Sequence, residues 1–364
     1  MSKIKPLLVS FVGARPQFIK IAPLAHNLRS KFRHIIVHSG QHYDKLMSEI
    51  FFNDLSIPHF KYNLSVGSGL HGQMTAAMMT RLEKLLLKIR PDMLLVYGDT
   101  NSTLAGAITA AKLHIPIGHI EAGMRSFRLD MPEEVNRRLT DHVSKLLFCP
   151  TPQSIVNLKN EGITEGIIHC GDLMYQLLEE NLPLIYENRK ILSQYNLAPG
   201  EYLLLTMHRA GNVDDLSRFR QIVDIINDLK YAIIFPIHPR TLKNLRRYRL
   251  YGKMTASRKI IITPPQSYLN NLSLIYNARA VLTDSGGVQK EAVFLGTPCL
   301  TLREETEWVE TLNQGNTLVG LSRTKINRAL SRPSAAVGPR PYRIKGKRPS
   351  DLIISALSDF FGDD

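Results

Sequence analysis

The stretch VLTDSGGVQKEAVFLG, residues 281–296, decides the fold. A short apolar run ends in the turn Asp284-Ser285-Gly286-Gly287, and the chain then takes on an amphipathic, helical pattern. This order is that of a strand, a glycine-rich turn and a helix. Ser285 on the turn is either a nucleophile or part of a cradle for a phosphate group.

The residues around the turn separate these two interpretations. A nucleophilic serine on such a turn needs the pattern Gly-x-Ser-x-Gly, and position 283 is Thr283. Two glycines at the start of a helix let the backbone approach an anion, towards which the first free N–H groups and the helix dipole point. The pattern therefore favours the cradle, with Glu291 one turn further on as a candidate acceptor for both hydroxyls of a ribose.

The same strand-and-helix alternation recurs along the chain. Helical patterns, such as those at 73–89 and 216–229, separate short continuous apolar runs, which are typical of strands buried on both faces. These strand candidates are PLLVSFVG, HIIVHSG, DMLLVYGD, IPIGHIEA, LLFCP, YLLLTMH, AIIFPIH, KIIITPP, AVLTDSG and TPCLTL. The sequence predicts an α/β protein with two Rossmann-like, doubly wound domains. Two such domains facing one another would form a cleft at the carboxyl ends of their strands.

Composition limits the classes of protein that fit. The chain has 364 residues, 44% of them hydrophobic, which is enough for two domains. Its three cysteines lack CxxC spacing, so we expect reduced thiols in a cytoplasmic protein rather than a zinc site. No apolar run approaches the ~20 residues that span a bilayer. The apolar run within residues 1–16 is too short for a signal peptide and predicts a buried first strand.

The net charge of +14 comes from two segments. Residues 240–259 carry eight basic and no acidic side chains, and residues 322–350 carry nine and none. Such runs are usually solvated faces, and no nucleic-acid-binding motif accompanies them. They could steer a polyanionic small molecule towards a cleft.

Polar residues cluster where the predicted strands end, which is the edge where α/β proteins bind ligands. Two cofactor patterns are weak: the GxGxxG at 67–72 is not in the first βα unit, and the Tyr-x-x-x-Lys at 186–190 lies in a polar connecting stretch. No HExxH is present, and His119, His208 and His238 each close a separate strand. Catalysis or leaving-group contact suits such isolated histidines better than metal binding does.

Read in order, the motifs resemble those of the non-hydrolysing UDP-N-acetylglucosamine 2-epimerase family, over nearly the whole chain. The resemblance rests on GARPQFIKIAPL, GQHYD, VYGDTNSTLAGAITAAKLHIPIGHIEAGMRSF, MPEEVNRRLTDH, TMHRAGN, TDSGGVQKEAVFLGTPCLTLREETEW and ETLNQGN. It implies a glycosyltransferase-B-type fold and a cytoplasmic homodimer. It also implies a first domain of residues 1–172, completed by the C-terminal helix 350–364, and a second, UDP-binding domain of residues 173–349.

The resemblance carries roles onto individual residues. It implies catalytic roles for Asp99, Glu121, Glu133 and His208. It implies substrate binding by Arg15, Lys20, Arg137, Gln266, Ser285, Gly286, Gly287 and Glu291. It places Gln41, His42, Gln73, Arg209 and His238 where bacterial members bind a second, activating UDP-sugar.

The implied reaction interconverts UDP-N-acetylglucosamine and UDP-N-acetylmannosamine, for precursors of surface polysaccharide. UDP leaves to give a 2-acetamidoglucal and then adds back. No nicotinamide or other cofactor and no metal is needed, and neither nucleic acid nor membrane is an expected partner. Two positions depart from the family pattern: Gly211 replaces a usual Glu, and Pro341-Tyr342 is followed by the basic Arg343-Ile344-Lys345-Gly346.

Three alternatives remain open. A branch of the family acts on UDP-2,3-diacetamido-2,3-dideoxy-glucuronate, shares several of these strings, and fits the basic surplus. A retaining glycosyltransferase would use the same fold and the same ribose contact. A non-catalytic binder of nucleotide sugars or nucleic acid would use the two basic runs.

Overall fold

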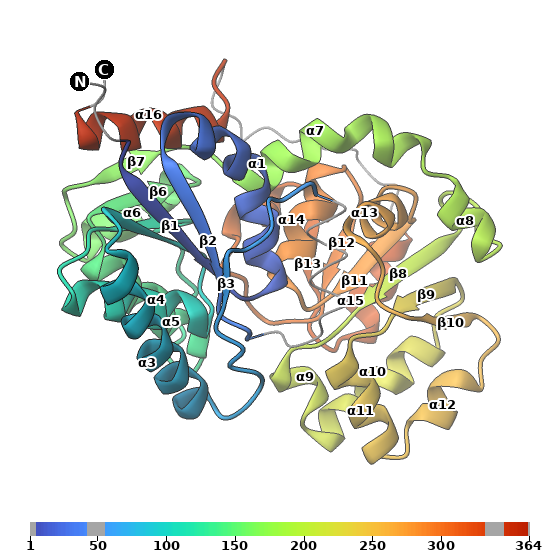
Figure 1. The fold of residues 1–364 in the computed structure, drawn as a ribbon. Helices are drawn as coiled ribbons and strands as arrows, with labels where there is room; N and C mark the ends of the chain where they lie inside the picture. The colour runs from blue at the N-terminus through green and yellow to red at the C-terminus, as the bar shows by residue number, and fades with distance from the viewer. Residues whose placement is uncertain (1–4, 42–54, 332–345, 363–364) are drawn as a thin grey trace. The chain divides into compact units, whose positions relative to one another are not determined.

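The computed structural model describes residues 5–41, 55–331 and 346–362 (Figure 1). Contacts between Cα atoms divide the chain into two compact units. Unit 1 consists of residues 1–179 with 341–364, and unit 2 of residues 180–340. Helix α7 (Leu173–Glu187) contains the boundary between them.

Unit 1 is built on a seven-stranded sheet in the order β3-β2-β1-β4-β5-β6-β7, with every pairing parallel. The strands are β1 (Leu7–Val12), β2 (Arg33–His38), β3 (Tyr62–Asn63), β4 (Met93–Tyr97), β5 (Ile117–Ile120), β6 (Leu146–Cys149) and β7 (Ile167–His169). The helices that accompany them are α1 (Arg15–Lys31), α3 (His71–Ile89), α4 (Asn101–Lys112), α5 (Pro132–Val143), α6 (Pro152–Asn160) and α16 (Pro349–Phe361).

The C-terminal helix α16 packs beside α1 within unit 1 (Figure 1). The rings of Phe32 and Phe361 lie 6.0 Å apart between centroids. At the other end of α16, the Gln176 side chain donates to Ser350 Oγ and accepts from the Ser350 N–H, both at 2.9 Å. Ile353 and Leu357 on the same helix are fully buried, so α16 supplies part of the core of unit 1.

Unit 2 repeats the architecture with a six-stranded parallel sheet in the order β10-β9-β8-β11-β12-β13. Its strands are β8 (Tyr202–Thr206), β9 (Ala232–Pro236), β10 (Ile260–Thr263), β11 (Ala280–Thr283), β12 (Cys299–Thr301) and β13 (Asn316–Leu318). Its helices are α8 (Lys190–Gln194), α9 (Ala210–Val213), α10 (Leu216–Asn227), α11 (Pro239–Arg247), α12 (Tyr251–Thr255), α13 (Tyr268–Tyr276), α14 (Gly286–Phe294), the 3₁₀ turn η1 (Val309–Asn313) and α15 (Arg323–Leu330).

All ten predicted strands are present, and three further strands were not predicted. The additional strands, β3, β7 and β13, lie at sheet edges and contain two or three residues each. Most of their side chains are partly or fully exposed, so they lack the continuous apolar run that marks a strand covered on both faces. No helix in the described ranges is long and apolar enough to cross a membrane.

In each sheet the strand order reverses at one point, between β1 and β4 in unit 1 and between β8 and β11 in unit 2. Ligands of doubly wound folds bind at the carboxyl ends of the strands beside such a reversal. The chain is tightly packed there in unit 1, because a Cβ on Gly13 would fall 2.6 Å from Ser102 Oγ. In unit 2 the hydroxyls of Thr206 and Thr283 are hydrogen bonded at 2.6 Å where β8 and β11 end.

Candidate functional site

Two ion pairs stand at the carboxyl edge of the unit 1 sheet. The Arg137 guanidinium on α5 donates to Asp99 Oδ2 at 2.6 Å, and Lys20 Nζ on α1 lies 2.9 Å from Glu121 Oε1. The side chains of Lys20 and Glu121 are only 7% and 12% exposed, whereas that of Asp99 is 28% exposed. Each carboxylate is therefore held in one orientation by a cation from a different helix.

The backbone around these pairs adopts a conformation that favours glycine. Gly98 has φ +62°, and a Cβ there would lie 3.1 Å from Lys20 Nζ and 3.6 Å from Glu121 Oε1. Glu121 itself has φ +74°, a conformation that costs a non-glycine residue free energy and that clusters at functional sites. The turns after β4 and β5 thus bring the two acidic side chains to the same edge.

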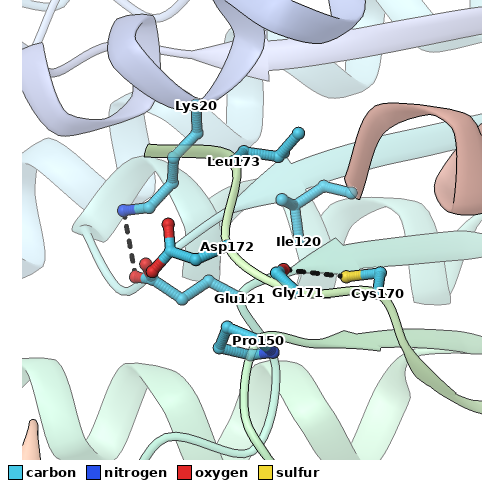
Figure 2. A pocket seen from close by; sticks show the side chains of 8 residues that line it. All are labelled: Lys20, Ile120, Glu121, Pro150, Cys170, Gly171, Asp172 and Leu173. Atoms are coloured by element: carbon cyan, nitrogen blue, oxygen red, sulfur yellow. Dashed lines mark hydrogen bonds and ion pairs between the residues drawn. The ribbon is translucent and has the colours of Figure 1, made fainter. Parts of the chain in front are cut away.

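A pocket opens beside the Lys20–Glu121 pair (Figure 2). Apart from Lys20 on α1, its lining residues end or follow β5, β6 and β7; they are Ile120, Glu121, Pro150, Cys170, Gly171, Asp172 and Leu173. The carboxylate of Asp172 points towards the ion pair, while its Oδ1 accepts the Met174 N–H at 2.7 Å at the start of α7. Asp172 was not among the predicted site residues.

A fully buried ionic network of Asp141, Arg125 and His119 lies behind the turns at this edge of the sheet. The sequence did not predict it. Asp141 on α5 accepts from Arg125 Nη1 at 2.7 Å, from the Gly123 N–H at 3.1 Å and from His119 Nδ1 at 2.6 Å. Burial by itself would raise the pKa of the Asp141 carboxyl, but His119 and Arg125 outweigh it and lower that pKa. The other ring nitrogen of His119 lies 2.7 Å from the Gly98 carbonyl oxygen.

His119 consequently differs from its predicted role. It lies inside β5 and has no exposed surface, so it cannot contact a ligand directly. Its two hydrogen bonds join Asp141 to the carbonyl that precedes Asp99. The expectation that His119 suits catalysis or leaving-group contact is wrong; it fixes the β4 turn.

Glu134 is the second buried carboxylate that the sequence did not identify. Its Oε2 accepts from Arg137 Nη1 at 2.9 Å and from the Ser126 N–H at 2.8 Å. Burial opposes ionisation of Glu134, but the Ser126 N–H and the Arg137 guanidinium outweigh it and lower its pKa. Arg137 therefore bridges Glu134 to Asp99, while the predicted Glu133 lies next to it on α5, partly exposed. Acidic and basic residues at 134, 137, 138 and 141 on one helical face were the available signal.

The remaining predicted residues of unit 1 lie around this cluster. Arg15 is partly exposed at the first position of α1. Gln41 Oε1 accepts from Ser102 Oγ at 2.7 Å and from the Ser102 N–H at 3.1 Å, at the start of α4. Gln73 is exposed on α3. His42 lies outside the described residues.

In unit 2, Asp284 organises the residues that follow β8 and β11. Its fully buried carboxylate accepts the backbone N–H of His208 at 3.0 Å and that of Arg209 at 3.1 Å, and the Asn212 side chain at 3.1 Å. The His208 side chain is 39% exposed, and its ring stacks on that of His238 with centroids 5.2 Å apart. Asp284 itself was not predicted as a site residue, yet it holds two predicted ones, His208 and Arg209, in one place.

The turn that opens α14 has the geometry of an anion cradle. Ser285 is the residue before the helix, and its side chain makes no capping hydrogen bond, so the first N–H groups are not capped by it. Gly286 and Gly287 are the first two helical residues. Glu291 lies one turn further along and is 2% exposed. The uncapped N–H groups and the positive end of the helix dipole attract an anion, and the two glycines let it approach the backbone closely.

Two predicted residues are not joined to either cluster. Gln266 donates to Tyr195 Oη at 3.2 Å and to the Pro264 carbonyl at 2.9 Å, in the loop after β10. Within the described part of the chain, neither Gln266 nor Gln73 hydrogen bonds to another predicted site residue. No group of three or more His, Cys, Asp or Glu side chains suited to a metal ion occurs among the described residues.

Comparison with known proteins identifies related chains. A profile of the UDP-N-acetylglucosamine 2-epimerase family matches residues 25–343. A Methanococcus maripaludis protein described as a UDP-N-acetylglucosamine 2-epimerase homolog is 49% identical over 352 residues, 96% of this chain and 99% of the relative. The UDP-2,3-diacetamido-2,3-dideoxy-D-glucuronate 2-epimerase of Pseudomonas aeruginosa is 46% identical, over 88% of this chain and 90% of the relative.

A solved structure agrees with the fold. The crystal structure of Methanocaldococcus jannaschii UDP-GlcNAc 2-epimerase in complex with UDP-GlcNAc and UDP superposes with a TM-score of 0.91 at 42% identity. The match covers 97% of this chain and 99% of that one. The predicted fold class of two Rossmann-like α/β domains is confirmed.

The buried carboxylates predict how unit 1 responds to acid. The partly buried Glu161 accepts from Arg125 Nε at 2.8 Å, and this hydrogen bond lowers its pKa as well. Because the pKa values of Glu134, Asp141 and Glu161 are lowered on folding, their contribution to stability is present above their ordinary pKa values and is lost as the pH falls below them. We expect the urea midpoint, followed by circular dichroism, to fall between about pH 5 and pH 3. Asp141→Asn should lower stability at pH 7 and flatten this dependence. The exposed Asp351→Asn should behave as wild type, and a midpoint constant across the range in the wild type would contradict the assignment.

Proposed function

The chain belongs to the UDP-N-acetylglucosamine 2-epimerase family, and we propose that it interconverts UDP-N-acetylglucosamine and UDP-N-acetylmannosamine without hydrolysis. The observation that carries the proposal is the pair of acidic side chains, Asp99 and Glu121, each fixed by a cation at the carboxyl edge of one sheet. The 45% identity to the UDP-N-acetylglucosamine 2-epimerase of Methanocaldococcus jannaschii, over 88% of this chain, supports the choice of substrate.

The chemistry of the substrate sets the order of events. The hydrogen on C2 of a hexose is not acidic, because no carbonyl group is attached to C2. Departure of UDP from C1 creates cationic character at the neighbouring carbon, and the C2 proton can then be removed. The product of this elimination is 2-acetamidoglucal with free UDP, and addition of UDP with a proton to the other face gives the epimer.

Unit 2 supplies groups suited to the leaving diphosphate. The N–H groups of Gly286 and Gly287 begin α14, and the positive end of the helix dipole lies there. His208 is held by Asp284 at the end of β8 with its ring partly exposed.

We assign Gly286, Gly287 and His208, with Ser285, to the diphosphate, and we assign Glu291 to the ribose. Arg15 in unit 1 and Gln266, for the uracil end, complete the proposed contacts.

Unit 1 supplies groups suited to proton transfer. Removal and return of a proton on opposite faces of C2 require at least two positioned acid–base groups. Asp99, Glu121 and Glu133 are the proposed groups, and Lys20 and Arg137 orient the first two.

A second substrate is favoured by one relative. The Pseudomonas aeruginosa enzyme named for UDP-2,3-diacetamido-2,3-dideoxy-D-glucuronate is 46% identical to this chain. That substrate carries an additional carboxylate, which suits a chain with a net charge of +14. NMR analysis of the products from each nucleotide sugar, supplied separately, distinguishes the two functions.

The setting of the reaction is also proposed. We place the enzyme in the cytoplasm, where nucleotide sugars are made, and its product among the precursors of surface polysaccharide. The three cysteines, Cys149, Cys170 and Cys299, are buried free thiols, which fits a reducing compartment. Gln41, His42, Gln73, Arg209 and His238 are the proposed contacts of a second, activating UDP-sugar.

A homodimer is supported by apolar side chains that unit 1 leaves exposed. Helices α3, α4 and α5 pack in a row in unit 1 (Figure 1). On α5, Val135 and Leu139 are 37% and 45% exposed one turn apart, and Leu87 on α3 is 58% exposed. A surface of this kind is typical of a subunit interface, and we propose that a second copy covers it.

Solvent exchange tests the reaction. In deuterated buffer the epimerised product should carry deuterium at C2, because the proton removed there exchanges with solvent before a proton returns. The measurement is NMR of UDP-N-acetylmannosamine formed from UDP-N-acetylglucosamine. Epimer that keeps its original C2 hydrogen would rule out the proposed elimination, and UDP released only in the presence of an acceptor would indicate a glycosyltransferase instead.

Asp99→Asn tests the division of roles. The amide keeps the size of the side chain but cannot take a proton, so turnover should fall by about 100-fold or more. Binding of UDP, measured by calorimetry, should stay at the wild-type value, because the proposed diphosphate contacts are in unit 2. Asp351→Asn on α16 is the matched control and should retain full activity. Wild-type turnover by Asp99→Asn would remove Asp99 from the mechanism.

Leu139→Glu tests the assembly. A carboxylate at the centre of the proposed interface would have to be desolvated, so the variant should sediment as a monomer at concentrations where the wild type is a dimer. Val156→Glu, on α6 and at a side chain 47% exposed, introduces the same charge outside the α3–α5 row and should leave the mass unchanged. A monomeric wild type, or a dimeric Leu139→Glu, would contradict this interface.

A further inference from the structure

Trp308, the only tryptophan of the chain, lies in the loop between β12 and η1 and is 4% exposed. Its backbone is fixed on both sides: the Trp308 N–H donates to Thr306 Oγ1 at 3.1 Å, and its carbonyl accepts from Thr311 Oγ1 at 2.6 Å. A lone buried aromatic residue is usually part of a core, and Trp308 was not among the predicted site residues.

A buried cation fixes the plane of the indole. Lys290 Nζ, on α14, lies 3.6 Å from the centroid of the Trp308 ring, and Lys290 is only 1% exposed. A desolvated cation–π contact of this kind is a strong one. The orientation of the indole is therefore coupled to the helix that begins with Gly286.

The indole N–H is directed at the first turn of that helix. Trp308 Nε1 lies 3.2 Å from where a Cβ on Gly286 would be, so only a glycine at this position leaves space beside the indole nitrogen. Among the described residues, Nε1 has no hydrogen-bond acceptor. A buried tryptophan N–H normally finds a partner, so this donor faces a position for an acceptor that is not part of the chain.

The carboxylate of Glu307 also lies beside Gly286, and the guanidinium groups of Arg303 and Arg209 offset its charge. Glu307 Oε1 lies against the same point on Gly286. Its Oε2 accepts from Arg303 Nη1 at 2.9 Å, and its Oε1 is 3.4 Å from Arg209 Nη2. Two arginines therefore contact one carboxylate, and Lys290 lies against the neighbouring indole, so the local charge still favours an anion.

We propose that the Trp308 Nε1–H donates a hydrogen bond to a diphosphate oxygen of the nucleotide sugar held at the N-terminus of α14. This inference rests on the proposed function and adds to it a binding residue outside the glycine turn. Gly286 is required on both counts, because a side chain there would occupy the position that the indole N–H and the bound oxygen share.

The single tryptophan makes the contact directly observable. A ¹⁵N–¹H correlation spectrum of the wild-type protein contains one indole resonance, which needs no assignment. Saturating UDP should move that resonance downfield and slow its exchange with solvent, because an N–H bonded to a charged oxygen is deshielded and protected. An unmoved resonance in a chain that calorimetry shows to be saturated with UDP would overturn the contact.

Trp308→Phe tests its contribution to binding. Phenylalanine keeps an aromatic face for Lys290 and removes only the donor, so the dissociation constant for UDP should rise about 10-fold. Tyr202→Phe is the matched control, since it removes a donor that bonds the Leu274 carbonyl at 2.6 Å at the other end of β8, and it should bind UDP as wild type does.

The outcomes separate the two levels of the proposal. Wild-type protein that binds no UDP overturns the proposed function and this inference with it. Wild-type protein that binds UDP, with Trp308→Phe binding equally well, overturns the role of Trp308 alone. If Trp308→Phe fails to fold, the wild-type indole resonance decides.

Discussion

The fully buried carboxylate of Asp141 is the constraint on which the edge of unit 1 depends. A charge removed from water must be paired or hydrogen bonded throughout, or the chain is strongly destabilised. Asp141 meets this requirement with Arg125, the Gly123 N–H and His119, which come from β5 and the turn after it. His119 passes the constraint on to the Gly98 carbonyl, and so the turns that carry Asp99 and Glu121 are fixed by one buried charge.

Unit 2 also contains a fully buried carboxylate at the edge of its sheet, but the groups that bond to it are mainly backbone N–H groups. This carboxylate is that of Asp284, and its partners are the backbone N–H groups of His208 and Arg209 and the amide of Asn212, with the ring of His208 beside it. Backbone donors fix the path of the chain rather than the side chains. The turn after β8 that carries His208 and Arg209 therefore has a fixed path, and Arg209 Nη2 lies 3.4 Å from Glu307 Oε1.

The sequence predicted the fold where a local pattern was sufficient. Most of the ten predicted strands are short runs dominated by apolar residues, as expected where helices cover both faces, and that pattern is visible in the sequence alone. Edge strands such as β7 and β13 are stabilised by one neighbour and by few buried side chains, so their residues carry no comparable signal. For the site, Asp99, Glu121 and His208 were predicted from their positions at strand ends together with the family resemblance. Glu134 and Asp141 were missed because only the packing of α5 reveals that these charged residues point inward.

Trp308 was missed for a related reason, and its chemistry explains why an indole suits that position. Beside the start of α14, Arg209 and Arg303 already contact Glu307 and Lys290 lies against the indole, so a further cation there would be repelled by them. An indole N–H adds a directed donor without adding charge, and the face of the same ring offsets the desolvation of Lys290. In the proposed elimination UDP stays bound beside a neutral glycal and then adds back, and the proposed indole donor would hold the diphosphate without adding charge to the empty site.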